Sequence, residues 1–310
     1  MARLVVCSQL TPEVRPGIMQ LIARSQDRTG HRPLPDQLWL DLMHGGRPGF
    51  TAIVALDNIV ALDHNATLDP DVLAYCQISQ GADGWTVALT LERPDDLVEL
   101  GTALLQRARE VIASRGGGSM HWWVYDPLPE ADSVAKAIGL RHGRSLYQMR
   151  VHLPLAGPEP DLPLRSFEVE RDEAAWLEVN NAAFAGHAEQ GGWDLAALRQ
   201  RELEDWFDPE GFLLHERDSR LAAFCWTKIH HETTPVMGEI YVVAVHPDFH
   251  GLGLGRALTR AGLASIATRG ITTGMLFVDQ HNTAAVELYR SLGFTVHRTD
   301  HAYTGHIEAA

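Results

Sequence analysis

The sequence predicts an α/β (α+β) fold built from two tandem copies of one unit. Three observations favour it. The 310 residues are about twice the usual length of a domain. The order of predicted helices and strands begins again after a proline-rich segment, and two pairs of matching segments lie at one spacing. The predicted parts are an N-terminal domain at 1–153, a linker at 154–163 and a C-terminal domain at 164–310.

The matching segments carry the argument for a duplication. Gly101-Thr-Ala-Leu and Gly255-Arg-Ala-Leu are 154 residues apart (255 − 101). Ile138-Gly-Leu and Leu292-Gly-Phe are also 154 residues apart (292 − 138). Two equal spacings favour an internal repeat over chance similarity.

The first copy begins with two helical patterns, continues with strand patterns and ends with strand and helix alternating. Apolar residues three and four apart indicate helices, and apolar or alternating runs between Asp-Asn, Asp-Pro and Asp-Gly turns indicate strands. The predicted helices are 13–25, 35–44, 96–114 and 130–138, and the predicted strands are 50–56, 59–63, 71–79, 85–91, 120–125 and 146–153.

The second copy repeats this order. Its helix at 254–268 has a clear apolar face, and its strand at 239–245 is apolar and β-branched and stops at His246-Pro-Asp. The predicted helices are 172–185, 194–204, 254–268 and 283–291, and the predicted strands are 211–216, 221–230, 239–245, 275–279 and one from 294.

A glycine loop separates that strand from the helix, with glycines at 251, 253 and 255. Glycine lets successive backbone N–H groups turn toward one point, and the start of the following helix adds partial positive charge. The loop therefore predicts a site for an anion such as a pyrophosphate. It has no Lys-Ser/Thr after the last glycine, as a nucleotide P-loop requires, and its spacing is not Gly-x-Gly-x-x-Gly.

The strand and loop together resemble the acetyl-CoA signature of the GNAT acetyltransferases. Val243-x-Val-x-Pro is followed by His250-Gly-Leu-Gly-Leu-Gly, with His250 where Gln or Arg is usual. The resemblance implies a mixed, largely antiparallel sheet flanked by helices in each copy, and acetyl-CoA bound mostly by backbone groups. The cofactor-binding residues it implies are Val243, Ala244, Val245, His250, Gly251, Leu252, Gly253, Leu254, Gly255 and Arg256, with Asn282, Thr283, Ala284, Ala285, Val286 and Glu287 beside the pantetheine arm.

A second motif of the same family lies about 35 residues after the glycine loop. Asn282-Thr-Ala-Ala-Val-Glu-Leu-Tyr-Arg-Ser-Leu-Gly-Phe resembles Asn-x-x-Ala-x-x-x-Tyr-x-x-x-Gly-Phe. The resemblance implies that Tyr289 protonates the departing CoA sulfur. The alternative is that Tyr289 only packs in the core.

Acyl transfer to an amine also needs a base and a donor to the developing oxyanion. Glu239, at the start of the central strand, is the predicted base, acting directly or through water; the alternative is a surface carboxylate at a strand end. The backbone N–H of Val243 is the predicted oxyanion donor, freed by a bulge that we expect at this residue.

Across nearly the whole chain the sequence resembles the actinobacterial mycothiol synthases. The segments that carry this resemblance, besides the tandem arrangement, are His187-Ala-Glu-Gln-Gly-Gly-Trp, Trp206-Phe-Asp-Pro and Trp226-Thr-Lys. That family acetylates the cysteinyl amine of a cysteine–glucosamine–inositol conjugate, a small thiol-glycoside. The substrate contacts that the resemblance implies are Asp36, Glu189, Lys228 and Glu239.

The first copy lacks the groups on which this chemistry depends. Opposite the glycine loop stands Asp96-Leu-Val-Glu-Leu-Gly, with one glycine and two carboxylates that would repel a pyrophosphate. Trp85 stands opposite Glu239, and Ala135 stands opposite Tyr289. We therefore expect the first copy to have lost catalysis and tight cofactor binding, and to serve as a wall or as part of the substrate pocket.

Composition narrows the function further. The formal charge of −14 disfavours nucleic-acid binding and permits an amine substrate. Three distant cysteines predict neither a disulfide framework nor a zinc site, and 16 histidines without metal-binding spacing predict no metal. The absence of a signal-length or membrane-spanning apolar run predicts a cytoplasmic protein without membrane contact, and we expect a monomer.

The preferred hypothesis is direct transfer within a ternary complex, because no Cys or Ser lies in a nucleophile motif. One alternative is a GNAT enzyme acting on another small amine or on a protein N-terminus. Another is a non-catalytic CoA-responsive module, against which Glu239 and Tyr289 both argue.

Overall fold

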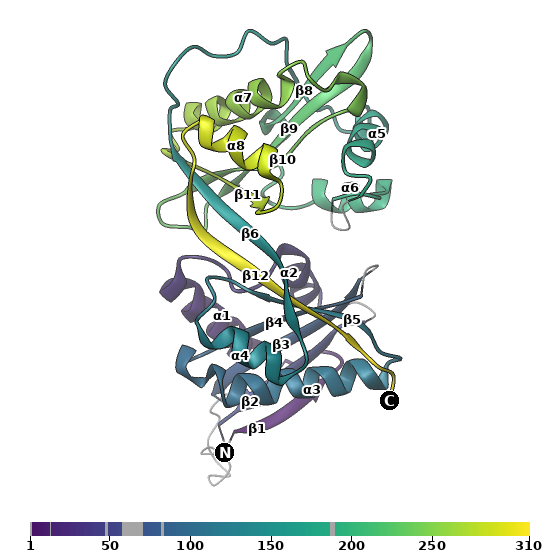
Figure 1. The fold of residues 1–310 in the computed structure, drawn as a ribbon, viewed down its shortest axis with the longest axis vertical. Helices are drawn as coiled ribbons and strands as arrows, with labels where there is room; N and C mark the ends of the chain where they lie inside the picture. Colours follow the sequence, from purple (N-terminus) through teal and green to yellow (C-terminus); the bar gives the residue numbers. More distant parts are fainter. Residues whose placement is uncertain (1, 13, 47–48, 58–70, 82–83, 187–189) are drawn as a thin grey trace. The chain divides into compact units, whose positions relative to one another are not determined.

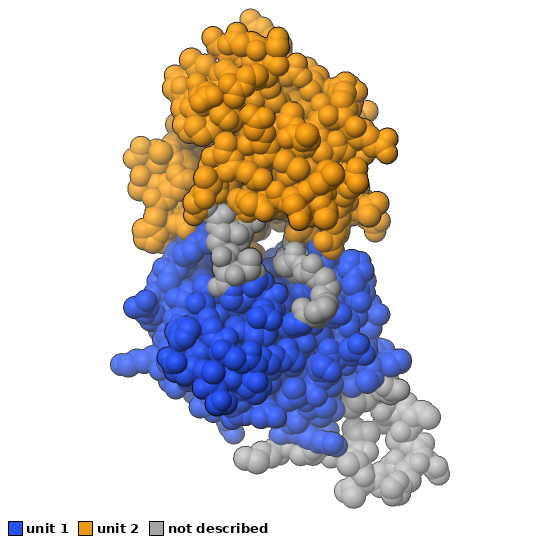
Figure 2. Space-filling model, turned by 90° about the vertical axis from the view of Figure 1, so that its right-hand side faces the viewer, with its two compact units in different colours: residues 1–146, 299–310 blue, residues 147–298 orange. Residues whose placement is uncertain are grey.

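The computed structural model describes residues 2–12, 14–46, 49–57, 71–81, 84–186 and 190–310. The chain forms two compact units, unit 1 at Met1–Leu146 and Thr299–Ala310, and unit 2 at Tyr147–Arg298 (Figure 2). Two long strands, β6 (Arg141–His152) and β12 (Thr295–Ile307), contribute residues to both units. The compact units therefore divide the chain within these strands, and the proline-rich segment remains our prediction for where the two copies meet in the sequence.

Unit 1 is a mixed sheet with helices on both faces. Its strands follow the order β1-β2-β3-β4-β5-β12, and every neighbouring pair is antiparallel except β4 and β5. One apolar core lies under α1 and α2, and another under α3 and α4. The elements are β1 (Arg3–Cys7), α1 (Arg15–Thr29), α2 (Asp36–Met43), β2 (Thr51–Leu56), β3 (Val72–Gly81), β4 (Gly84–Leu91), η2 (Pro94–Leu97), α3 (Leu100–Ser114), β5 (Gly118–Val124) and α4 (Glu130–Ala137).

Unit 2 repeats this plan. Its strands follow the order β11-β10-β9-β8-β7, antiparallel except for β10 and β11. Helices α7 and α8 cover one face, and α5 and α6 cover the other (Figure 1). The elements are β7 (Arg165–Ser166), α5 (Glu173–Ala183), α6 (Leu195–Glu202), η3 (Pro209–Gly211), β8 (Phe212–Arg217), β9 (Arg220–His230), β10 (Met237–Val245), η4 (Pro247–Phe249), α7 (Leu254–Thr268), β11 (Thr273–Asp279) and α8 (Thr283–Ser291).

The two faces of the unit 2 sheet carry different cores. Under α5 and α6 the core is aromatic: the rings of Phe212 and Trp226 stack with centroids 4.4 Å apart, and Trp176 meets both edge-on. Under α7 and α8 it is mainly aliphatic. Each such fully buried side chain stabilises the fold by about 1.5–3 kcal/mol. Among the residues described above, no helix is both long and apolar enough to cross a membrane.

A glycine lets α7 approach the sheet closely. A Cβ atom on Gly262 would lie 2.6 Å from Cys225 Sγ and 2.9 Å from Ile240 Cδ1, both closer than van der Waals contact allows. These two residues belong to β9 and β10. Close packing at this point fixes α7, and with it the glycine loop that precedes it, against the central strand.

The structure confirms the repeat. Helices α3 and α7 both have 15 residues, and both ends of α7 lie 154 residues after those of α3 (254 − 100 and 268 − 114). A short 3-10 turn precedes each helix, η2 in unit 1 and η4 in unit 2. The predicted mixed sheets flanked by helices are likewise confirmed in both units.

Some predicted elements differ from the observed ones. The helix expected at 96–114 begins only at Leu100, because Pro94–Leu97 form a 3-10 turn. The strand expected from residue 146 begins at Arg141, where exposed polar residues hide the strand pattern. Strands β1 and β7 were not predicted. The strand expected at 59–63 lies outside the described residues.

Candidate active site

The glycine loop adopts the left-handed backbone that its sequence predicts. Gly251 has a φ of 80° and Gly253 a φ of 74°. A Cβ atom built on either glycine would meet no other atom within 4 Å. Glycine is therefore needed here for the backbone angle and not for packing, and the loop is open to an approaching ligand.

The loop and the start of α7 carry a row of free donors. The first helical hydrogen bond of α7 runs from Ala257 N–H to Gly253 O, at 3.2 Å. In the described part of the chain, no acceptor is found for the N–H groups of residues 251–256. Free donors at a helix start carry partial positive charge, so this segment fits a diphosphate such as that of CoA.

Two side chains anchor this loop. His250 Nε2 lies 3.0 Å from the carbonyl oxygen of Val245, and this bond ties the loop to the end of β10. Arg256 donates to the Oγ of Ser291 and so joins α7 to the end of α8. Both side chains are thus used to hold the loop, which leaves anion binding to the backbone.

Strand β10 carries an irregularity beside the loop. It pairs with β11 at Gly238 and Glu239, and no further pair joins the two strands within the described ranges. Its register with β9 shifts between Ile240 and Val242, which makes Tyr241 the bulged residue. The bulge expected at Val243 was therefore misplaced, because a run that is apolar at every position has no alternation to mark the shift.

Beyond the bulge, backbone groups of β10 point to the gap beside β11. The N–H of His246 donates to the carbonyl oxygen of Ala222, on the β9 side. The carbonyl oxygen of Val245 is bonded by the His250 side chain. Since alternate residues of a strand direct their backbone groups to opposite sides, the N–H groups of Val243 and Val245 point away from β9. They face the side on which β10 has parted from β11.

A buried charged cluster surrounds Glu239. Glu239 stands directly opposite Lys228 in the β9–β10 register, and their exposed fractions are 6% and 4%. His230 Nε2 lies 2.7 Å from Glu239 Oε2, and His230 Nδ1 lies 3.0 Å from Glu232 Oε1. Lys228, His230 and Glu239 are thus buried charged groups, and the partly exposed Glu232 adds a second negative charge at the edge of the cluster.

The hydrogen bonds of His230 determine its protonation. Burial by itself lowers the pKa of His230, but the bonds to Glu232 and Glu239 outweigh that effect and raise the pKa to about 9. His230 is therefore an imidazolium at neutral pH.

Aromatic rings cover Lys228. Its Nζ lies 4.6 Å from the ring centroid of Trp206 and 5.5 Å from that of Tyr241. A cation over an aromatic face is stabilised by the ring quadrupole. The rings therefore hold the ammonium on the face of the sheet that α5 and α6 cover.

Tyr289 lies on the opposite face of the sheet, in the core under α7 and α8. Burial, with a smaller contribution from Cys225, raises the pKa of Tyr289 to about 12, so its hydroxyl stays protonated at neutral pH. Its helix α8 is capped by Asn282, whose side chain accepts from Ala285 N–H at 3.2 Å. Base and acid candidates thus flank β10 from its two sides.

The structure places the predicted substrate residues unequally. Lys228 and Glu239 are neighbours. Asp36 is the first residue of α2 in unit 1, and its side chain lies outside what the structure describes. Glu189 also lies outside the described residues.

His230 was not predicted from the sequence, because the histidines were considered only as possible metal ligands. The sequence did contain a signal that places His230 near Glu239. Residues 228 and 230 of one strand share a face, and a short hairpin returns Glu239 beside them.

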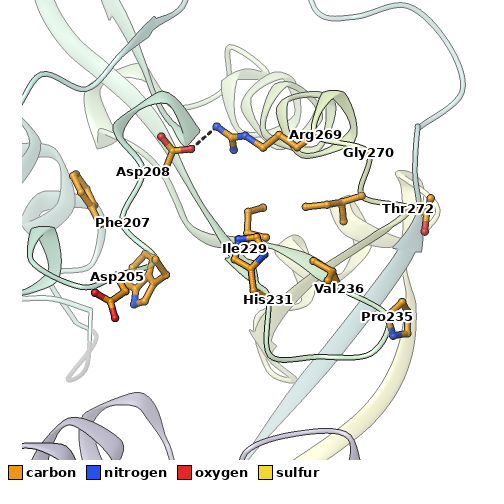
Figure 3. Close-up of a pocket in the computed structure, with 12 residues that line it drawn as sticks. Asp205, Phe207, Asp208, Ile229, His231, Pro235, Val236, Arg269, Gly270 and Thr272 are labelled. Atoms are coloured by element: carbon orange, nitrogen blue, oxygen red, sulfur yellow. Dashed lines mark hydrogen bonds and ion pairs between the residues drawn. The ribbon is translucent and has the colours of Figure 1, made fainter.

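A pocket of unit 2 lies next to this cluster and has a volume of about 640 Å³. Ile229 and His231 point into it, and the ion pair of Asp208 and Arg269 lies at its upper rim in Figure 3. Lys228 and His230 occupy the alternate positions of the same strand and do not line it. Since none of the predicted catalytic residues lines this pocket, it is a neighbour of the candidate site.

Unit 1 lacks the corresponding features. Strands β4 and β5 stay paired from Trp85 through Ala88, and the β3–β4 register runs without a shift. In place of the glycine loop, both carboxylate oxygens of Asp96 accept from Arg93, at 3.0 and 2.7 Å. Strand pairing in this copy thus continues three residues beyond Trp85, the position opposite Glu239, and its described part has no glycine cradle.

Comparison with known proteins agrees with this geometry. The acetyltransferase (GNAT) family matches residues 173–294, which hold the glycine loop and Tyr289. In solved structures, a GCN5-related N-acetyltransferase from Sphaerobacter thermophilus has a TM-score of 0.72 at 21% identity and covers 99% of this chain and 96% of its own. A tandem GNAT protein of the clavulanic acid pathway has a TM-score of 0.71 at 15% identity over 100% of both chains. At these identities the likeness concerns the fold.

Sequence relatives are closer. The mycothiol acetyltransferase of Thermobispora bispora is 40% identical over 300 residues, which cover 94% of this chain and 96% of the relative. That of Thermomonospora curvata is 41% identical over 298 residues, which cover 93% of each chain. With such identity over nearly its full length, the chain belongs to the mycothiol acetyltransferase family.

Proposed function

We propose that the protein is an acetyl-CoA-dependent N-acetyltransferase that acetylates the cysteinyl amine of the cysteine–glucosamine–inositol conjugate to give mycothiol. One observation carries the proposal: Glu239 and Tyr289 flank β10 from opposite faces where it parts from β11, beside a loop of free N–H groups. A base, an acid and an anion site are the groups that acetyl transfer from CoA requires.

Acetyl-CoA supplies the acetyl group as an activated thioester. The N–H groups of residues 251–256 bind the diphosphate, and the start of α8 lies beside the pantetheine arm. The Val243 N–H, which points to the gap between β10 and β11, donates to the developing oxyanion. Donors fixed in advance by a strand need no reorganisation during the reaction, which is why they are effective.

The proton steps fall to two side chains. Glu239 accepts a proton from the acceptor amine, directly or through one water, so that the nitrogen lone pair can attack. Tyr289 donates its hydroxyl proton to the leaving sulfur. The raised pKa of Tyr289 keeps that proton in place until negative charge develops on the sulfur.

Direct transfer is favoured over an acyl-enzyme. Cys225 is the cysteine of unit 2, and it is fully buried. Burial raises the pKa of its thiol to about 12, so the reactive thiolate does not form at neutral pH. Burial has the same effect on Cys76.

The acceptor contacts follow from charge and position. Lys228 and Glu239 offer a donor and an acceptor for the sugar hydroxyls and the amine. Asp36 and Glu189 are proposed as further contacts on the resemblance to relatives.

The test is acetyl transfer to the cysteine–glucosamine–inositol conjugate, followed by mass spectrometry, with free cysteine, glucosamine and an N-terminal peptide as competing acceptors. We expect the conjugate to be preferred by kcat/KM and Lys228→Ala to reduce that preference. Preferential acetylation of the peptide or of another small amine would favour the alternative substrates and refute the mycothiol assignment.

A further inference from the structure

We propose that His230 is a positioning residue of the acetyl transfer: its ring grips one oxygen of Glu239 and leaves the other oxygen for the acceptor amine. This inference rests on the proposed function, in which Glu239 is the base. It adds a residue that neither the family motifs nor the predicted contacts contain.

The geometry is a clamp with two ends. Nε2 of His230 lies 2.7 Å from Glu239 Oε2, and Nδ1 lies 3.0 Å from Glu232 Oε1. With both ring nitrogens engaged, the ring cannot rotate without losing two charge-assisted hydrogen bonds. The ring therefore fixes the Glu239 carboxylate in one orientation.

The second oxygen of Glu239 is left available. Within the described residues, no protein donor bonds to Oε1 of Glu239. This oxygen is also not fully buried, so a ligand can reach it. A carboxylate with one oxygen held and one open is oriented to accept a proton from a bound amine. Such orientation accounts for a large part of the efficiency of a general base.

The positive charge of His230 also compensates the buried negative charge of Glu239. Side-chain exposures are 8% for Glu239 and 12% for His230, so both ionised groups have lost most of their hydration. A buried carboxylate without a partner is strongly disfavoured, and the imidazolium compensates it. The charged groups that act on His230 are Glu232 and Glu239, which favour its protonation, and Lys228, which opposes it.

Glu232 anchors the clamp from outside. Its side chain is 40% exposed, and it lies in the turn after β9. It bonds Nδ1 of the ring, whereas Glu239 bonds Nε2. Its removal should therefore loosen the clamp without removing any group from the base itself.

The kinetic test compares His230→Gln with Glu232→Gln and with the control His231→Gln. His231 is exposed and next in sequence, so the control carries the same substitution outside the clamp. At pH 7 we expect His230→Gln to lower kcat/KM for the conjugate about 10- to 100-fold, with the KM for acetyl-CoA within about twofold of wild type. Glu232→Gln should show a smaller loss, and His231→Gln none.

The pH profile separates positioning from simple damage to the fold. A cation beside a carboxylate favours its ionised form, so removal of the cation makes protonation of the carboxylate easier. The acidic limb of kcat/KM should therefore shift to higher pH in His230→Gln. If the acidic limb stays at the wild-type pH, the proposal is overturned, whether kcat/KM equals that of wild type or is lowered by the same factor at every pH.

A measurement without substrate keeps this test independent of the proposed function. In the free protein, NMR titration of the His230 ring should give a midpoint near pH 9, which falls by a unit or more in Glu239→Gln. A midpoint at the ordinary histidine value in wild type would refute the clamp. If the clamp is present but wild type does not acetylate the conjugate, the proposed function fails and the positioning role in this transfer fails with it.

Discussion

His230 and Glu239 meet across the β9–β10 hairpin, with Nε2 and Oε2 2.7 Å apart and both side chains largely buried. The pair lies on one face of the sheet, and Tyr289 lies on the other. Both sides of the central strand are thus supplied with a titratable group whose proton is fixed by its surroundings. This arrangement leads to predictions for stability as well as for catalysis.

Stability should depend on pH through His230. Its pKa is raised to about 9 in the folded state, above the ordinary 6.5, so its contribution is complete below pH 6.5 and is lost as pH rises through 9. The contribution is on the order of 3 kcal/mol. Thermal unfolding at pH 6.5 and pH 10 should show a larger decrease in Tm for wild type than for His230→Gln. Equal decreases in the two proteins would contradict this account.

A side chain at position 251 or 253 of the glycine loop should weaken the binding of CoA. In Gly251→Ala and Gly253→Ala, a residue with a Cβ atom must adopt a positive φ, at a cost of about 1–2 kcal/mol. Relaxation of the backbone would turn the N–H groups away from the diphosphate. We expect the Kd for CoA, measured by calorimetry, to rise at least about tenfold.

Gly270 provides the matched control for the loop variants. It lies just after the other end of α7 and has a φ of 77°. As at Gly251 and Gly253, a Cβ atom on Gly270 would meet no other atom within 4 Å. Gly270→Ala should therefore lower Tm by a similar amount and leave CoA binding unchanged. Equal loss of CoA affinity in all three variants would mean that strain in α7, and not the loop, controls binding.

Tyr289→Phe should separate chemistry from cofactor binding. Phenylalanine keeps the ring in the core beside Phe294 but removes the proton that the sulfur needs. We expect kcat to fall about 10²-fold, within the range for general acids, with the Kd for CoA unchanged. Tyr147→Phe, in the same core, is the control and should retain full activity. Wild-type kcat in Tyr289→Phe would leave Tyr289 with only a packing role.

The sequence was most informative where local rules decide structure. Helices α7 and α8 were predicted with their observed bounds, because Gly253 and Asn282 mark their starts and an apolar face runs through each. The repeat was also visible, since equal spacings survive divergence of the residues between them.

Other features depend on contacts between strands, which no local pattern contains. The bulge at Tyr241 was placed at Val243, because every residue from Ile240 to Val245 is apolar or aromatic and either position fits the pattern. His230 was overlooked for a related reason. Its role arises from a carboxylate nine residues later in the chain that the hairpin brings to 2.7 Å.

The last prediction concerns the number of cofactor sites. Unit 1 keeps β4 and β5 paired through Ala88, three residues beyond the position opposite Glu239, whereas β10 and β11 part directly after Glu239. The first copy therefore has no gap at the position where β10 and β11 part. Acidic Asp96 and Glu99 stand before α3 and would repel a diphosphate, although Arg93 pairs with Asp96. Titration of the full chain with CoA should therefore give one tight site, and this site should disappear in the double variant Gly251→Ala, Gly253→Ala. Two sites of equal affinity, or a tight site that survives the double variant, would show that the first copy still binds the cofactor.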